Sequence, residues 1–340
     1  MQTASRLLST NLVTASRVYG GGNSQVYRLT DCRGSSWCGK VYAAPKPGRQ
    51  DRMETEWRAL SFLWDHGKRF VPQPVARDDL SKIAIYQWIE GSRFTDRLIA
   101  EPEVRLAVSL LRELDEISEV SDAGQLPVAS EAFFSIEDIH QNLTARGRRL
   151  QDSEGNSPEH ESMRIFVAGE LTEARERFTE RARVGYRSLG RDPQQILPHT
   201  ERVLSPSDFG FHNALDSSAG VMWLDFEYFG WDDPAKTMAD FVLHPAMKMS
   251  DQARRFFWQD VACLLGRGDD LALRARWLYP LHGVQWCLII LNEFLREDLE
   301  RRLLASGQDA TAQDLRARQL DKARQLLKTV IEHDKSFPYH

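Results

Sequence analysis

The segment from residue 203 to 235 constrains this chain most, because it combines negative charge with aromatic side chains and contains no lysine or arginine. Carboxylates that lie close together repel one another unless water, a divalent cation or a cationic partner neutralises them. The interleaved aromatic and aliphatic residues argue against a simple solvated loop. The segment therefore predicts a partly buried carboxylate cluster, formed by Asp208, Asp216, Asp225, Glu227, Asp232 and Asp233.

This acidic segment also interrupts a helical pattern that dominates the chain after residue 100. Proline, glycine and serine punctuate residues 205–213, which indicates a loop. Two short extended pieces follow, at residues 214–216 and 221–226, separated by a Ser-Ser-Ala-Gly turn. We expect a small β-hairpin between helices, with most of the candidate chemistry around it.

The spacing of the polar residues in this segment indicates a type of chemistry. Asp208 and Asn213 are separated like the Asp and Asn of a kinase catalytic loop, and Asp225 stands where such a fold has a metal-binding Asp-Phe-Gly. Phosphoryl transfer to a hydroxyl needs a carboxylate that orients the attacking group and accepts its proton. It also needs oxygen ligands for a metal ion on the phosphates. Asp208 fits the first role, and Asn213 and Asp225 fit the second.

The first 90 residues predict a sheet with one helix, at residues 51–66. A glycine-rich sequence between the first two strands would let the backbone approach phosphates, although an ordinary hairpin turn has the same composition. The expected strands are residues 12–19, 25–30, 37–44, 74–77 and 83–88. The glycine-rich residues are Gly20, Gly21, Gly22, Asn23 and Ser24.

A buried ion pair is predicted between Lys40 and Glu56. Apolar residues spaced one helical turn apart form a stripe along the expected helix, and Glu56 falls inside that stripe whereas Glu54 falls on the polar side. A carboxylate on a buried face needs a cation. Lys40, in the middle of an apolar strand, is the natural candidate.

In chain order, these motifs resemble those of the aminoglycoside phosphotransferase family, kinase-like enzymes that phosphorylate small molecules. The resemblance extends from Arg17 to His244 and is strongest over residues 203–240. It implies an α+β, bilobal protein-kinase-like fold. The N-terminal lobe, residues 1–90, would hold an antiparallel sheet with one helix and bind the nucleotide. The mainly helical C-terminal lobe, residues 91–340, would carry the catalytic loop and the acceptor site.

The resemblance also implies roles for individual residues. Asp208 would be the catalytic base, and Mg²⁺ would bind Asn213 and Asp225, with ATP or alternatively GTP as the nucleotide. One departure from the family is Pro206, which stands where the family usually has a histidine. The implied nucleotide-binding residues are Gly20, Gly21, Gly22, Asn23, Ser24, Lys40, Glu56 and a hinge at Gln87, Trp88 and Ile89. The candidate acceptor-binding residues are His212, Glu227 and Trp231.

Two other functional classes fit less well. A protein kinase needs a long activation segment ending in Ala-Pro-Glu, but 14 residues separate Asp225 from Asp240 and no such motif follows. A nucleotide-binding pseudokinase or scaffold typically loses one of the charged groups that this chain keeps. The acceptor remains open among sugars, amino sugars and amino alcohols, and the excess of acids favours a cationic one.

Composition sets the remaining bounds. A net charge of −5 over 340 residues shows no electrostatic footprint for nucleic acid or an anionic membrane, so neither is an expected partner. Four cysteines are too few for a disulfide scaffold and favour reduced thiols in the cytoplasm. Residues 1–30 contain arginines and no acids, as a transit peptide would, but cleavage there would remove the glycine-rich motif. The oligomeric state is not indicated.

Overall fold

The N-terminal lobe is built on a five-stranded antiparallel sheet with strand order β1-β2-β3-β5-β4. The computed structural model describes residues 1–19, 24–45, 50–94, 97–266, 270–300 and 312–339. The predicted antiparallel sheet is confirmed, and each strand ends within two residues of its expected position. The strands are β1 (Leu12–Val18), β2 (Ser24–Asp31), β3 (Ser36–Tyr42), β4 (Pro74–Asp78) and β5 (Ile83–Gln87).

A helix covers each face of this sheet, because successive residues of a strand point to opposite sides. In β5, Ile85 packs in one cluster with Ala4 of α1 (Gln2–Leu8), whereas Tyr86 belongs to the cluster that contains α2 (Arg52–Asp65). The expectation of one helix in this lobe missed α1. A seven-residue helix is not stable alone in water, so α1 depends on the packing of its apolar side chains against the sheet.

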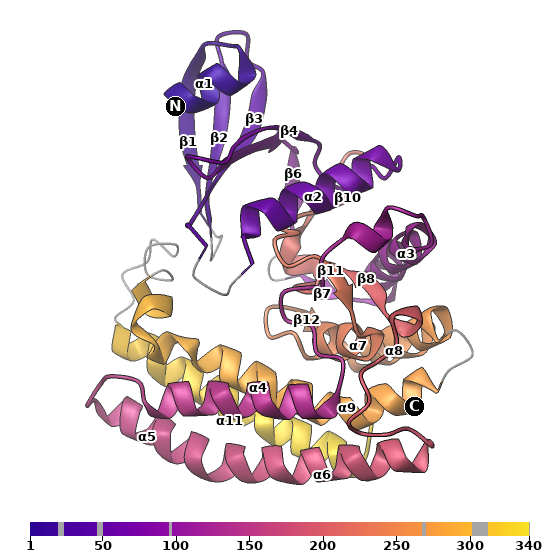
Figure 1. The fold of residues 1–340 in the computed structure, drawn as a ribbon. Helices are drawn as coiled ribbons and strands as arrows, with labels where there is room; N and C mark the ends of the chain where they lie inside the picture. Colours follow the sequence, from indigo (N-terminus) through magenta and orange to yellow (C-terminus); the bar gives the residue numbers. More distant parts are fainter. Residues whose placement is uncertain (20–23, 46–49, 95–96, 267–269, 301–311, 340) are drawn as a thin grey trace.

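The C-terminal lobe is mainly helical, as predicted. Figure 1 shows the sheet and α1 at one end of the molecule, with α4, α5, α6 and α11 at the other and α7 between them. All ten residues of α7 are buried. A π-helical turn, Val167–Leu171, joins α5 to α6. The helices are α3 (Glu101–Ser118), α4 (Ile136–Gln151), α5 (Pro158–Phe166), α6 (Thr172–Ser188), α7 (Pro234–Leu243), α8 (Asp251–Leu265), α9 (Leu271–Ile290) and α11 (Ala312–Lys335).

Short strands hold the acidic segment in place between these helices. The expected hairpin is confirmed as β9 and β10, and β6 pairs with the edge of β9. Strand β8 pairs with β11, and β7 pairs with β12. The loop after β8 is therefore fixed at both ends. The strands are β6 (Gly91–Arg93), β7 (Leu98–Ile99), β8 (Val203–Ser205), β9 (Ala214–Ser217), β10 (Gly220–Trp223), β11 (Gly230–Asp232) and β12 (Lys248–Met249).

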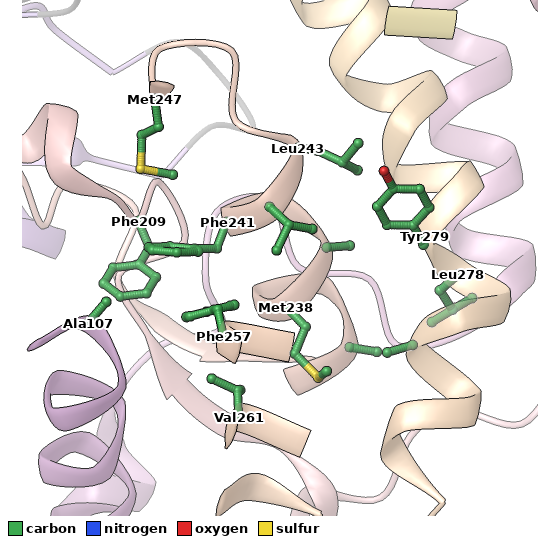
Figure 2. Packing of buried hydrophobic residues seen from close by; sticks show 14 of the residues in the cluster. Ala107, Phe209, Met238, Phe241, Leu243, Met247, Phe257, Val261, Leu278 and Tyr279 are labelled. Carbon is green, nitrogen blue, oxygen red and sulfur yellow. The ribbon is translucent and has the colours of Figure 1, made fainter. Parts of the chain in front are cut away.

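An aromatic core lies directly beneath that loop. Phe209 packs against Phe241 of α7, with ring centroids 5.0 Å apart, and Phe241 stacks on Phe257 of α8 at 3.8 Å. Figure 2 shows Phe209 and Phe241 side by side, with Met247 close above them. Removing one such ring from a core typically costs about 3–5 kcal/mol. The ring of Phe209 thus anchors the loop to α7. Among the described residues, no helix is both long and apolar enough to cross a membrane.

Candidate active site

Lys40 of β3 joins the two lobes through a cluster of carboxylates. Its Nζ lies 2.6 Å from Glu56 Oε2 and 2.6 Å from Asp225 Oδ1, and 3.9 Å from Glu227 Oε2. The predicted Lys40–Glu56 pair is confirmed. The Tyr42 hydroxyl also donates to Glu56 Oε2 at 2.6 Å, which fixes that carboxylate further.

The charges in this cluster keep the lysine protonated. Burial lowers the pKa of Lys40, but Asp225, Glu56 and Glu227 outweigh it, so the pKa is raised well above its ordinary value. Burial and then Asp225 raise the pKa of Glu227 to about 8, although Lys40 opposes them. The site therefore contains more carboxylate than its buried cation neutralises.

Glu227 lies among the carboxylates around Lys40, although the sequence grouped it with the candidate acceptor-binding residues. Its side chain is buried, and Oε1 lies 3.7 Å from Nε of Arg52 in α2. Oxygen atoms of Glu56, Asp225 and Glu227 lie within 4.8 Å of one another, a grouping that could hold a cation. The structure therefore places Glu227 with the groups expected to bind nucleotide and metal.

The loop after β8 brings Asp208 and Asn213 together. Asn213 lies in a 3₁₀ turn, Phe211–Asn213, and its Nδ2 donates to the Asp208 main-chain oxygen at 3.1 Å. Oδ1 of Asp208 lies 3.1 Å from His212 Nε2 and 3.3 Å from His244 Nε2. Burial raises the pKa of Asp208, but the two imidazoles outweigh it and hold the pKa well below its usual range. Asp208 is therefore ionised at neutral pH.

Two residues of the site have left-handed backbone conformations that glycine normally favours. Ser207 has φ 66° and Asp225 has φ 64°, and such a conformation costs a residue with a side chain about 1–2 kcal/mol. Ser207 is held by two hydrogen bonds. Its N–H donates to Ser205 Oγ at 3.1 Å, and its hydroxyl accepts from Lys236 Nζ at 3.1 Å. Strain of this kind is typical of functional sites.

Lys236 of α7 was not among the predicted site residues, yet it binds the loop through the Ser207 hydroxyl. It is 2% exposed and lies 3.0 Å from Asp232 and 2.9 Å from Asp240. The i, i+4 spacing of these three residues was the available sequence signal.

The acidic segment is therefore not neutralised as one cluster. Buried cations from outside the segment serve part of it: Lys236 pairs with Asp232, and Arg274 of α9 pairs with Asp233 at 2.7 Å. The expectation of a carboxylate cluster that water, a metal or a partner must neutralise is wrong for these two aspartates. Their counter-charges lie later in the sequence, where a search within residues 203–235 does not find them.

The remaining predicted residues lie in several places. Trp231 lies in the core, 6% exposed, and its Nε1 donates to the Ala123 oxygen at 3.0 Å. This burial leaves little ring surface for an acceptor, contrary to the expectation. His212 lies beside Asp208, as described above.

The expected hinge, Gln87 to Ile89, begins at the last residue of β5, an inner strand of the sheet. Gln87 ends β5 opposite Trp37, and Arg28 lies over the Trp88 ring at 4.8 Å. Ile89 comes after β5 and before β6. Ser24 begins β2, and the predicted glycine-loop residues Gly20, Gly21, Gly22 and Asn23 lie outside the described residues.

Comparison with known proteins agrees with this geometry at the level of fold. No family model and no curated protein matches the sequence. A spectinomycin phosphotransferase solved with ADP and spectinomycin is similar over 95% of this chain and 97% of its own, with TM-score 0.64 and 14% identity. An ethanolamine kinase from Plasmodium vivax covers 94% and 83%, with TM-score 0.60 and 12% identity. A choline kinase from Cryptosporidium parvum covers 96% and 93%, with TM-score 0.58 and 10% identity. The chain therefore has the bilobal, protein-kinase-like fold seen in small-molecule kinases.

Proposed function

We propose that this protein is an ATP-dependent phosphotransferase that moves the γ-phosphate to a hydroxyl group of a small molecule. The observation that carries the proposal is the position of Lys40, 2.6 Å from both Glu56 in one lobe and Asp225 in the other. A lysine held in this way presents a fixed positive charge to the phosphates of a bound nucleotide. The solved spectinomycin phosphotransferase with ADP supports the choice of an adenine nucleotide.

Asp208 is the proposed base. Its ionised carboxylate would accept a hydrogen bond from the acceptor hydroxyl, orient that oxygen towards the γ-phosphorus and take up its proton as the new O–P bond forms. The bond from the γ-phosphorus to the β,γ-bridging oxygen breaks, and ADP leaves. The His212 and His244 contacts keep this carboxylate charged at neutral pH.

The oxygen donors in the site suit Mg²⁺, which prefers carboxylate and amide oxygens. Asn213 uses its Nδ2 to bind the Asp208 carbonyl, so Oδ1 is its ligand atom. Asp225, with Glu227 beside it, supplies the carboxylate. A bound Mg²⁺ would neutralise charge on the phosphates and so assist the leaving of ADP.

A small molecule is the proposed acceptor, because the structure leaves a short connection after Asp225. After Asp225, strand β11 already begins at Gly230 and helix α7 at Pro234. The connection between Asp225 and α7 is therefore too short for a protein-kinase activation segment. The charge argument for a cationic acceptor is weaker than the sequence suggested, since Lys236 and Arg274 neutralise part of the acidic segment. Spectinomycin, choline and ethanolamine, named for the similar structures, set the range to search.

The test is a screen for Mg-ATP consumption over sugars, amino sugars, amino alcohols and aminoglycosides, with mass spectrometry of the products. Asp208→Asn serves as the blank, and we expect it to lose transfer and to keep Mg-nucleotide binding. Asp216→Asn is the matched control, because Asp216 is an exposed acid of the same segment that pairs with Arg97 at 3.2 Å. Equal turnover by Asp208→Asn and the unmodified protein would refute the proposal.

A further inference from the structure

Two histidines converge on a single oxygen of Asp208. His212 comes from the catalytic loop, whereas His244 follows the last residue of α7, 36 positions away from Asp208. Both Nε2 atoms approach Oδ1, at 3.1 and 3.3 Å, and the two rings stack with centroids 3.8 Å apart and planes inclined by 11°.

A backbone hydrogen bond defines the tautomer of His244. The Ala246 N–H donates to His244 Nδ1 at 3.2 Å, so Nδ1 acts as an acceptor and carries no hydrogen. In a neutral imidazole the hydrogen then lies on Nε2, which makes Nε2 a donor towards Asp208. Burial and the neighbouring His212 also lower the pKa of His244, which favours the neutral ring.

This tautomer also decides between two interpretations of the cluster. Asp208, His212 and His244 offer three ligand atoms within 4.8 Å of one another, as a metal site would. A metal ion on Nε2 of His244 would leave neither ring nitrogen protonated, because Nδ1 already accepts from Ala246. A neutral His244 that donates from Nε2 to Asp208 keeps one ring nitrogen protonated. The geometry therefore favours a hydrogen bond over a metal ion at this cluster.

The surroundings hold His244 in this orientation. Its side chain is 7% exposed, and Trp286 of α9 meets it edge-on, with ring centroids 4.5 Å apart. Trp286 is fixed in turn by donating from Nε1 to Asp240 Oδ1 at 2.9 Å.

The segment that follows His244 also contacts the catalytic loop. The Phe211 N–H donates to Met247 Sδ at 3.3 Å. A Cβ placed on Gly210 would lie 2.6 Å from that sulfur, so glycine permits this close approach. Figure 2 shows Met247 next to Phe209 in the core. Residues 244–247 therefore support the loop that carries Asp208 through contacts at Asp208 and Phe211.

We infer that His244 is a positioning residue which, together with His212, holds Asp208 by Oδ1 and leaves Oδ2 to meet the acceptor hydroxyl. The consequence for catalysis rests on the proposed function, but the contact itself does not. A carboxylate held at one oxygen by two donors loses rotational freedom, and well-oriented reacting groups contribute much of the rate in phosphoryl transfer.

The first experiment tests the contact without using activity. Long-range ¹H–¹⁵N spectra of the histidine side chains at neutral pH, assigned with His244→Gln, should show His244 as the neutral Nε2–H tautomer. Asp208→Asn should shift this resonance, and Asp216→Asn should not. A neutral Nδ1–H tautomer, an imidazolium, or a resonance that ignores Asp208→Asn would overturn the inference.

The second experiment tests the consequence, as ADP release from Mg-ATP with water alone as the acceptor. We expect His244→Leu to lower kcat about tenfold or more and to leave the KM for ATP within about twofold. His244→Gln, whose Nε2 can replace the donor, should recover most of the rate. Equal rates for the Leu variant and the unmodified protein, or no rescue by Gln, would overturn the positioning role. Absence of ADP release from the unmodified protein both with water and with every acceptor of the screen would refute the proposed function, and the spectra would then decide the contact separately.

Discussion

Replacing Lys236 with methionine should destabilise the C-terminal lobe and do so in a pH-dependent way. The ammonium group is buried between Asp232 at 3.0 Å and Asp240 at 2.9 Å, and Asp232 is 0% exposed. Methionine has a similar volume and length but no charge. The change therefore leaves two buried carboxylates without their cation, at little cost in packing.

The size of the effect follows from this geometry. Removing one partner of a buried ion pair typically costs about 3–5 kcal/mol, because the other charge stays buried and uncompensated. Whole domains are stable by only about 5–15 kcal/mol. We therefore expect the free energy of unfolding to fall by about 3–5 kcal/mol at pH 8, measured by urea denaturation with tryptophan fluorescence.

The pH dependence has a defined sign. Burial raises the pKa of Asp232 to about 6, even though Lys236 opposes the shift. Because Lys236 opposes this shift, its removal raises the pKa of Asp232 further in the variant. A carboxylate whose folded pKa is raised opposes folding while it is ionised, and this penalty disappears as the pH falls towards its unfolded pKa. The pKa of Lys236 is raised above its ordinary value, so its own charge is constant between pH 5 and 8. The difference between the variant and the unmodified protein should therefore be largest at pH 8 and shrink towards pH 5.

Two variants control this measurement. Lys236→Met combined with Asp232→Asn removes both charges of one pair and should recover about 2 kcal/mol or more of the lost stability. Lys328→Met changes an exposed lysine of α11 and should stay within about 0.5 kcal/mol of the unmodified protein. A loss below about 1 kcal/mol at pH 8, or a loss that does not decline towards pH 5, would refute the reasoning.

Two further predictions concern the residues around the nucleotide and the loop. Glu56→Gln should lower kcat/KM for ATP about tenfold or more, since a hydrogen bond to a charged group is worth about 1.5–3 kcal/mol. Glu54→Gln, which affects a surface pair with Arg77, should change kcat/KM less than about twofold; similar losses in the two variants would contradict the assignment. The free energy of unfolding of Ser207→Gly should lie within about 1 kcal/mol of the unmodified protein, because the relief of backbone strain at φ 66° offsets the loss of the hydrogen bond from Lys236. Ser207→Val should lose about 2 kcal/mol or more in the same urea assay, and a Val variant as stable as the Gly variant would exclude backbone strain at this position.

Local periodicity was sufficient to predict the elements that carry the site. Turn residues between short extended runs located the sheet strands, and the apolar stripe of α2 distinguished Glu56 from Glu54 as the partner of Lys40. Both signals are local, because the side-chain direction of a strand or helix repeats within a few residues. The spacing of Asp208 and Asn213 was equally informative, since the loop between them folds so that Asn213 Nδ2 donates to the Asp208 main-chain oxygen.

Long-range packing explains what the sequence left unpredicted. Helix α1 is stable only against the sheet, and Trp231 is buried because β11 pairs with β8 and its indole reaches Ala123. His244 lies far from Asp208 along the chain and approaches it because α7 ends beside the loop. No periodic pattern within residues 203–235 carries this information.

The order and type of the polar residues thus led to the proposed chemistry, with a lysine for the phosphates, an acid as the base and oxygen ligands for a metal ion. The division of the acidic segment came from the packed helices. Buried Lys236 and Arg274 neutralise Asp232 and Asp233, whereas Asp225 pairs with Lys40 and, like Asp208, belongs to the proposed active site. The physical reason is that a carboxylate's role depends on which cation and how much water lie within a few ångströms, and those neighbours come from distant parts of the chain.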